Sequence, residues 1–122
     1  MPKKTQIEHQ ISDAIINFEK EYMGRGPLET QTYIIDNMIL VRLKGVLTRA
    51  ELQLVKSEDT DRGRKLIKEV RIELIEKGRP LLDAAVEAIT GQKVVSLHTD
   101  ISTVTGERVI LFTTQENIIK SP

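Results

Sequence analysis

The chain has 122 residues, a length that fits one domain with a single hydrophobic core of modest size. Eighteen basic and eighteen acidic side chains leave no formal net charge, so the sequence lacks the field expected of a protein that binds nucleic acid or an anionic membrane surface. The absence of cysteine excludes disulfides and thiolate chemistry, and no stretch resembles a secretory signal or a membrane span. We therefore expect a soluble cytoplasmic protein that does not insert into a membrane.

The first 44 residues predict a helix followed by a β-hairpin. Apolar residues repeat at helical spacing from about residue 6 to 23, after a Thr5 and Glu8 capping box, and two glycines and a proline in residues 24–27 should end the helix. Residues 30–44 alternate as two strands around an Asp36-Asn37 turn.

Both faces of this hairpin are apolar near its turn. One face carries Ile34, Ile39, Val41 and Leu43, and the other carries Tyr33, Ile35, Met38 and Leu40. An antiparallel sheet usually leaves one polar face to water, so the second apolar face indicates that something covers it.

A short helix to about residue 56, opened by a Thr48 and Glu51 capping box, should precede a polar turn over residues 57–61 and a long helix from about 61 to 90. Pro80 lies inside the long helix, so the segment is either one bent helix or two shorter helices.

The long helix has an apolar arc of about 200°, twice the width that a surface helix needs. Its members are Leu66, Ile67, Val70, Leu74, Leu81, Ala84, Ala85 and Ala88, extended by Ile75, Leu82, Val86 and Ile89. This width predicts two apolar neighbours, which are the sheet of the same chain on one side and a second helix or subunit on the other.

A second hairpin follows over residues 94–101 and 108–113, joined around Thr105-Gly106, and the faces below hold if this pair forms a two-residue turn. Alternation assigns Val95, Leu97, Ile101, Ile110 and Phe112 to one face, and His98, Asp100, Ser102, Val109 and Leu111 to the other. The tail over residues 115–122 has no clear period and is expected to be less ordered.

These elements predict one α+β domain over residues 1–122 in the order α-ββ-αα-ββ. Four mainly antiparallel strands, arranged as two hairpins, should pack on the long helix in two layers, and a homodimer should cover the surplus apolar surface. The pattern leaves the strand order open.

Three arginines raise the possibility of a small-anion site. Arg25 and Gly26 belong to a glycine-rich segment that could form an anion nest, although a plain chain reversal is the favoured interpretation. Arg71 lies inside the apolar arc, where a charge is usually paired or extends to solvent. The alternative is that Arg71 projects into a groove with Arg25 and Arg42, and burial of Arg71 against a carboxylate of its own chain would count against it.

His98 and Asp100 are two residues apart on one strand face, so they could act as an acid and base pair in a weak hydrolase. A half-exposed polar strand face is the favoured interpretation. The two histidines, His9 and His98, belong to different elements, and we predict no metal, cofactor or catalytic residue. A helix-turn-helix over residues 48–75 is disfavoured because its turn is acidic, and the scarcity of aromatic residues also argues against nucleic acid.

The order and spacing of several motifs resemble the bacterial MpsC-type family. These motifs are residues 21–27 (EYMGRGP), residues 45–48 (GVLT) with Glu51, residues 91–94 (GQKV) and residues 98–103 (HTDIST), and the resemblance covers about residues 7–114. Gly24, Arg25, Gly26, Asp36, Gly45, Thr48 and Asp100 match the recurring pattern of this family. They represent either turns that define the fold or a binding surface, and the family supplies no catalytic residues to carry over.

The resemblance implies a small protein associated with a sodium-translocating, membrane-potential-generating system connected with inorganic carbon uptake. We therefore predict a non-enzymatic accessory, regulatory or docking protein. Its expected partners are a second copy of the chain and a protein of a membrane transport system, so its expected location is cytoplasmic and peripheral to the inner membrane through that partner. The alternatives are a small-anion or carboxylate-binding domain and the weak hydrolase.

Overall fold

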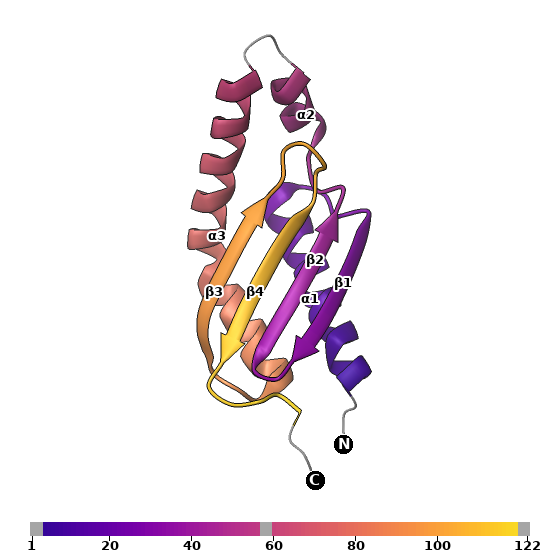
Figure 1. Cartoon of the computed structure of the whole chain (residues 1–122), viewed down its shortest axis with the longest axis vertical. Helices are drawn as coiled ribbons and strands as arrows, with labels where there is room; N and C mark the ends of the chain where they lie inside the picture. The colour runs from indigo at the N-terminus through magenta and orange to yellow at the C-terminus, as the bar shows by residue number, and fades with distance from the viewer. Residues whose placement is uncertain (1–3, 57–59, 120–122) are drawn as a thin grey trace.

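The computed structural model in Figure 1 describes residues 4–56 and 60–119. The elements in this part of the chain are α1 (Lys4–Met23), β1 (Glu29–Ile35), β2 (Met38–Lys44), α2 (Arg49–Lys56), α3 (Thr60–Thr90), β3 (Val94–Ile101) and β4 (Arg108–Thr114). The strands form one antiparallel sheet in the order β1-β2-β4-β3, so β2 and β4, the second strands of the two hairpins, pair at its centre. Helices α1 and α3 lie on one face of the sheet, and no described helix covers the other face (Figure 1). The predicted two-layer α+β architecture is confirmed.

The first hairpin forms as predicted. Ile35 pairs with Met38 across the turn, and Asp36 adopts a positive φ of 56°, a conformation that Asp and Asn tolerate better than most residues. Ile34, Ile39, Val41 and Leu43 all lie in the core, whereas Tyr33 and Ile35 are 42% and 50% exposed. The predicted second apolar face therefore exists, and within this chain it stays open.

The second hairpin differs from its prediction at both ends. A loop over residues 102–107 replaces the two-residue turn, with the Ser102 N–H donating to the Glu107 carbonyl at 2.8 Å, and Ile101 pairs with Arg108. A two-residue turn would pair Ile101 with residue 110 instead, and a shift of two residues preserves the faces of the strands. A register irregularity between residues 94 and 96 leaves Val95 60% exposed, so its predicted place on the same face as Ile110 and Phe112 was wrong.

The first helix starts earlier than predicted. Helix α1 already includes Lys4 and Thr5, so Thr5 is not the residue that precedes the helix. Glu8, the expected capping partner, instead accepts a hydrogen bond at 2.9 Å from the Ile34 N–H of the edge strand β1. The helix buries Ile7, Ile11, Ile15 and Phe18, together with the charged residue Glu19.

Helix α3 is one continuous helix, so the two-helix alternative is wrong. Pro80 lies on its exposed side. The side that faces α1 and the sheet buries Ile67, Arg71, Ile75, Gly78, Leu82 and Val86. A second apolar side remains uncovered, which explains the unusual width of the apolar arc.

The tail begins with ordered contacts. The Gln115 N–H donates to the Lys93 carbonyl at 3.2 Å, and the Ile118 N–H donates to the Asp36 carbonyl at 3.1 Å. The Ile118 side chain is buried beside the core. Residues 120–122 of the predicted tail and residues 57–59 of the predicted polar turn lie outside the described residues.

Candidate functional site

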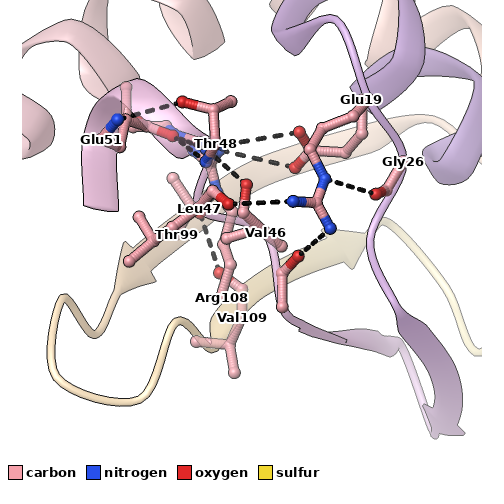
Figure 2. A network of polar contacts seen from close by, with 12 residues as sticks. Glu19, Gly26, Val46, Leu47, Thr48, Glu51, Thr99, Arg108 and Val109 are labelled. Carbon is pink, nitrogen blue, oxygen red and sulfur yellow. Dashed lines mark hydrogen bonds and ion pairs between the residues drawn. The ribbon is translucent and has the colours of Figure 1, made fainter. Parts of the chain in front are cut away.

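A buried cluster of four charged residues joins all three helices to the sheet. Its members are Glu19 of α1, Glu51 of α2, Arg71 of α3 and Arg108 of β4, and we call it the ion cluster. Figure 2 labels Glu19, Glu51 and Arg108 of this cluster. The side chains of Glu19, Arg71 and Arg108 are each 2% exposed. Two positive and two negative groups balance, which is the condition under which buried charges are tolerated.

Glu51 is the best-connected carboxylate of the cluster. Its two oxygens accept hydrogen bonds from Nη2 and Nε of Arg71 at 2.6 and 2.8 Å, which is a bidentate geometry. Oε1 also accepts from the Thr48 N–H at 2.8 Å, while the Glu51 N–H donates to Thr48 Oγ1 at 3.2 Å. The predicted Thr48 and Glu51 capping box is confirmed, and the same carboxylate attaches α2 to α3.

Arg71 also reaches the loop before α2, because its Nη2 donates to the Val46 carbonyl at 2.8 Å. Helix α2 itself has no fully buried residue. Hydrogen bonds from Arg71 to both Glu51 and Val46 are therefore a principal attachment of the α2 segment to the rest of the domain.

Glu19 lies between the two arginines. Its oxygens are 3.5 Å from Nη1 of Arg71 and 3.7 Å from Nη1 of Arg108, which are ion-pair distances longer than good hydrogen bonds. Burial raises the pKa of Glu19 above its usual 4.5, even though Arg108 and Arg71 both act to lower it. Burial also lowers the pKa of Arg108, which Glu19 opposes, and Nε of Arg108 donates to Thr99 Oγ1 at 3.1 Å.

The pKa of Glu51 shifts in the opposite direction and predicts an acid-sensitive contact. Burial acts to raise this pKa, but hydrogen bonds from Arg71 and Thr48 together outweigh it, so the pKa lies below its usual 4.5. A carboxyl group with a lowered folded-state pKa stabilises the fold above its unfolded-state pKa, and this contribution is lost as the pH falls through the folded-state value. We expect urea unfolding to show stability falling below about pH 4.5, with a shallower fall for Glu51→Gln. Identical slopes for the two proteins would contradict this expectation.

The predicted arginine site is not assembled as a groove. The Nη1 and Nη2 atoms of Arg25 donate to the carbonyls of Leu47 and Gly45, both at 3.2 Å, and its Nε contacts the Gly26 carbonyl at 3.4 Å. Arg42 lies on the outer face of the sheet and pairs with Glu107 at 2.8 Å. Arg71 is buried against carboxylates of its own chain, which is the arrangement stated above as counting against a shared anion site.

His98 and Asp100 lie on the outer face of β3, where both are exposed. Oδ1 of Asp100 is 3.5 Å from Nζ of Lys68 and accepts a hydrogen bond from the Ile101 N–H at 2.8 Å. These contacts with Lys68 and with its own backbone fit the polar-strand interpretation of Asp100 better than an acid and base pair. Among the described residues, no group of three or more His, Asp or Glu side chains is arranged to hold a metal ion.

The uncovered side of α3 carries an exposed apolar surface. We call it the α3 stripe and define it as Leu66, Val70, Leu74, Leu81, Ala84 and Ala88. Val70 and Leu81 are 53% and 56% exposed. An open groove of about 570 Å³ follows part of the stripe, lined by Glu69, Val70, Ile72, Glu73, Leu74 and Lys77. Exposed apolar surface of this kind commonly marks an interaction site.

Sequence reasoning singled out Arg71 but did not connect it with Glu19, Glu51 and Arg108, the other three members of the ion cluster. Two signals were available. Glu19 follows Ile11 and Ile15 at intervals of four residues, which places it on the apolar side of α1, and Arg108 precedes Ile110 and Phe112 at intervals of two, which places it on the core face of β4. A charge on a core face predicts a buried counter-charge.

The fold and the ion cluster define a two-layer α+β protein whose helices and sheet are joined by buried charges. A family model described as "Na+-translocating membrane potential-generating system (MpsC)" matches residues 3–116. The chain belongs to this family, as its motifs indicated.

Two proteins of Bacillus subtilis (strain 168) are similar to this chain. YbcI, described as uncharacterized, is 46% identical over 109 residues, covering 89% of this chain and 86% of YbcI. YrhF, also described as uncharacterized, is 31% identical over 97 residues, covering 76% of this chain and 75% of YrhF. No solved structure matches. Of the helices that the structure describes, none combines the length and the apolar character needed to cross a bilayer.

Proposed function

We propose that this chain is a non-enzymatic accessory protein that docks through the α3 stripe on a protein component of a membrane cation-translocating system. The observation that carries the proposal is the uncovered apolar side of α3, with Val70 and Leu81 more than half exposed. Surface helices usually bury their apolar side, so an apolar stripe left open within the chain is best explained by a partner. The class of partner comes from the description of the family.

The charges beside the stripe indicate the chemistry of the partner surface. Glu69, Glu73 and Lys77 line the groove together with Val70 and Leu74. An apolar ridge, such as one side of a helix, would fill the groove, and basic side chains along that ridge would complement the two carboxylates. In this proposal the protein is cytoplasmic, self-associates as a homodimer and reaches the inner membrane only through its partner. The connection with inorganic carbon uptake is part of the same proposal.

A pull-down from native membranes tests this function. The tagged chain should recover a membrane protein of a cation-translocating system, identified by mass spectrometry. Recovery should fall at least about tenfold for Val70→Asp with Leu81→Asp, because two carboxylates in a desolvated interface cost several times the roughly 1.4 kcal/mol that this change represents.

Val104→Asp provides the matched control, because Val104 is an exposed apolar residue of the loop over residues 102–107 and not of the stripe. This variant should recover the partner as well as the unmodified chain does. Repeated failure of the unmodified chain to recover any membrane component would overturn the proposal, as would equal recovery by the stripe variant.

A further inference from the structure

The outer face of the sheet carries a second apolar surface, separate from the α3 stripe. We call it the sheet patch and define it as Tyr33, Ile35, Met38, Leu40, Val109 and Leu111. The strand register places Tyr33, Leu40, Leu111 and His98 in one row across all four strands. This face points away from the helices (Figure 1), so the sheet patch and the α3 stripe belong to opposite layers of the domain.

Charged residues lie beyond the patch, toward the end of the sheet where β2 and β3 finish, and they divide this part of the outer face into two halves of opposite sign. On β1 and β2 the charged residues are Arg42, Lys44 and Glu29, which sum to one positive charge. On the other half they are Asp100 of β3 and Glu107, the loop residue just before β4, both negative. Arg42 and Lys68 pair with these two carboxylates within the chain, but the side chains of Arg42, Lys44 and Asp100 remain 46%, 49% and 75% exposed.

We propose that a second copy of this chain covers the sheet patch, face to face, with the two-fold axis parallel to the strands and between β2 and β4. This axis places the basic half of each copy over the acidic half of the other, with Leu40 opposite Leu111 and Tyr33 opposite His98. An axis perpendicular to the strands would place each strand over its own copy with the strand direction reversed, so the basic half of one copy would not meet the acidic half of the other. Sheets that pack face to face with aligned strands are a common architecture.

Extension of the sheet through its β1 edge is a less favourable way to pair two copies. The Ile34 N–H of this edge already donates to Oε2 of Glu8 at 2.9 Å. A second strand would have to displace this charge-assisted hydrogen bond and approach a carboxylate, a device that protects edge strands from pairing.

This inference deepens the proposed function and rests on it in one respect. The proposed function assigns the α3 stripe to the membrane partner, so the second copy is placed on the sheet patch. Light scattering on the full chain at tens of micromolar should give about twice the 13.8 kDa of one copy. Leu111→Asp should halve that mass while circular dichroism stays unchanged, whereas Val70→Asp with Leu81→Asp should keep the mass of the dimer.

Cross-linking tests the orientation without placing a charge in the interface. The chain has no cysteine, so a Tyr33→Cys and His98→Cys double variant presents only two thiols. Within one copy, β1 and β3 are three strand spacings apart, about 14 Å, whereas packed sheets are about 10 Å apart. A bifunctional maleimide of about 10 Å should therefore join two copies of the double variant, and each single variant should react far less.

Several outcomes would overturn the inference. These are a single-copy mass for the unmodified chain, a dimer that persists in a folded Leu111→Asp variant, and efficient cross-linking of Val70→Cys in place of the double variant. None of them affects recovery of a membrane partner through the α3 stripe. Conversely, failure of the unmodified, dimeric chain to recover a membrane partner would overturn the proposed function and leave this inference standing.

Discussion

Replacing Arg71 with methionine is expected to lower the free energy of unfolding by about 3–5 kcal/mol, the usual cost of leaving a buried charge without its partner. Glu51 would lose its two hydrogen bonds from Arg71, and the Val46 carbonyl would lose its hydrogen bond from the same side chain. Glu19 would keep only Arg108, at 3.7 Å. The loss should shrink as the pH falls below about 5, because protonated carboxyl groups no longer need a counter-charge. Urea unfolding at pH 7 and pH 4 measures both effects.

Arg79→Met provides a matched control for Arg71→Met. Arg79 also lies on α3 and pairs with Asp83 at 3.4 Å, but its side chain is 35% exposed. A partly exposed i,i+4 pair of this kind contributes roughly 0.3–0.5 kcal/mol. Similar losses for the two variants would show that the ion cluster does not hold the fold together. Hydrogen exchange adds a local measurement, because the amides of α2 should lose protection in Arg71→Met and keep it in Arg79→Met.

A double variant separates the charge effect from packing. Combining Arg71→Met with Glu51→Gln removes one charge of each sign, so the double variant should be less destabilised than the sum of the two single changes. Additive losses would indicate that Arg71 stabilises the domain by filling space and not through its charge.

The fold was predictable to the extent that it follows from local pattern. Alternation around Asp36-Asn37 gave the first hairpin and both of its faces, because period-2 burial leaves only one consistent register there. The irregularity between residues 94 and 96 was not predictable, because nothing in the residues themselves distinguishes Val94 from Val95. Strand order was likewise open, since the pairing of β2 with β4 depends on contacts between residues about seventy positions apart.

The candidate site was predictable only in part, because burial of some α3 residues depends on partners that are distant in the sequence. Its excess of apolar residues indicated two neighbours, and the structure leaves the corresponding stripe open. The side that faces the core, however, includes Arg71 and Gly78, which a search for apolar residues overlooks. Arg71 is buried because Glu19 and Glu51 neutralise it, and Gly78 is buried because it allows close approach of α1. Both reasons depend on residues distant in the sequence.

Gly78→Ala is expected to destabilise the protein by about 1–3 kcal/mol, the usual cost of overpacking a core. A Cβ atom at this position would lie 2.4 and 2.5 Å from Cε2 and Cζ of Phe18, too close for any carbon contact. The Phe18 ring is itself buried and stacks on Tyr22 with 4.5 Å between ring centroids, so it has little room to move away. In an exposed helix the same change would instead stabilise by about 1 kcal/mol, because alanine has the higher helix propensity. The sign of the effect therefore reports how closely α1 and α3 approach.

A compensating change at Phe18 tests the mechanism directly. Phe18→Leu alone should destabilise by leaving space beside Gly78, and Gly78→Ala should then fill part of that space. The double variant is expected to be more stable than the sum of the two single losses predicts, and urea unfolding measures this coupling. A Gly78→Ala variant at least as stable as the unmodified chain would contradict the close packing of α1 on α3. In that case the clash would be relieved by a shift of α3, which would also move Arg71 relative to Glu19.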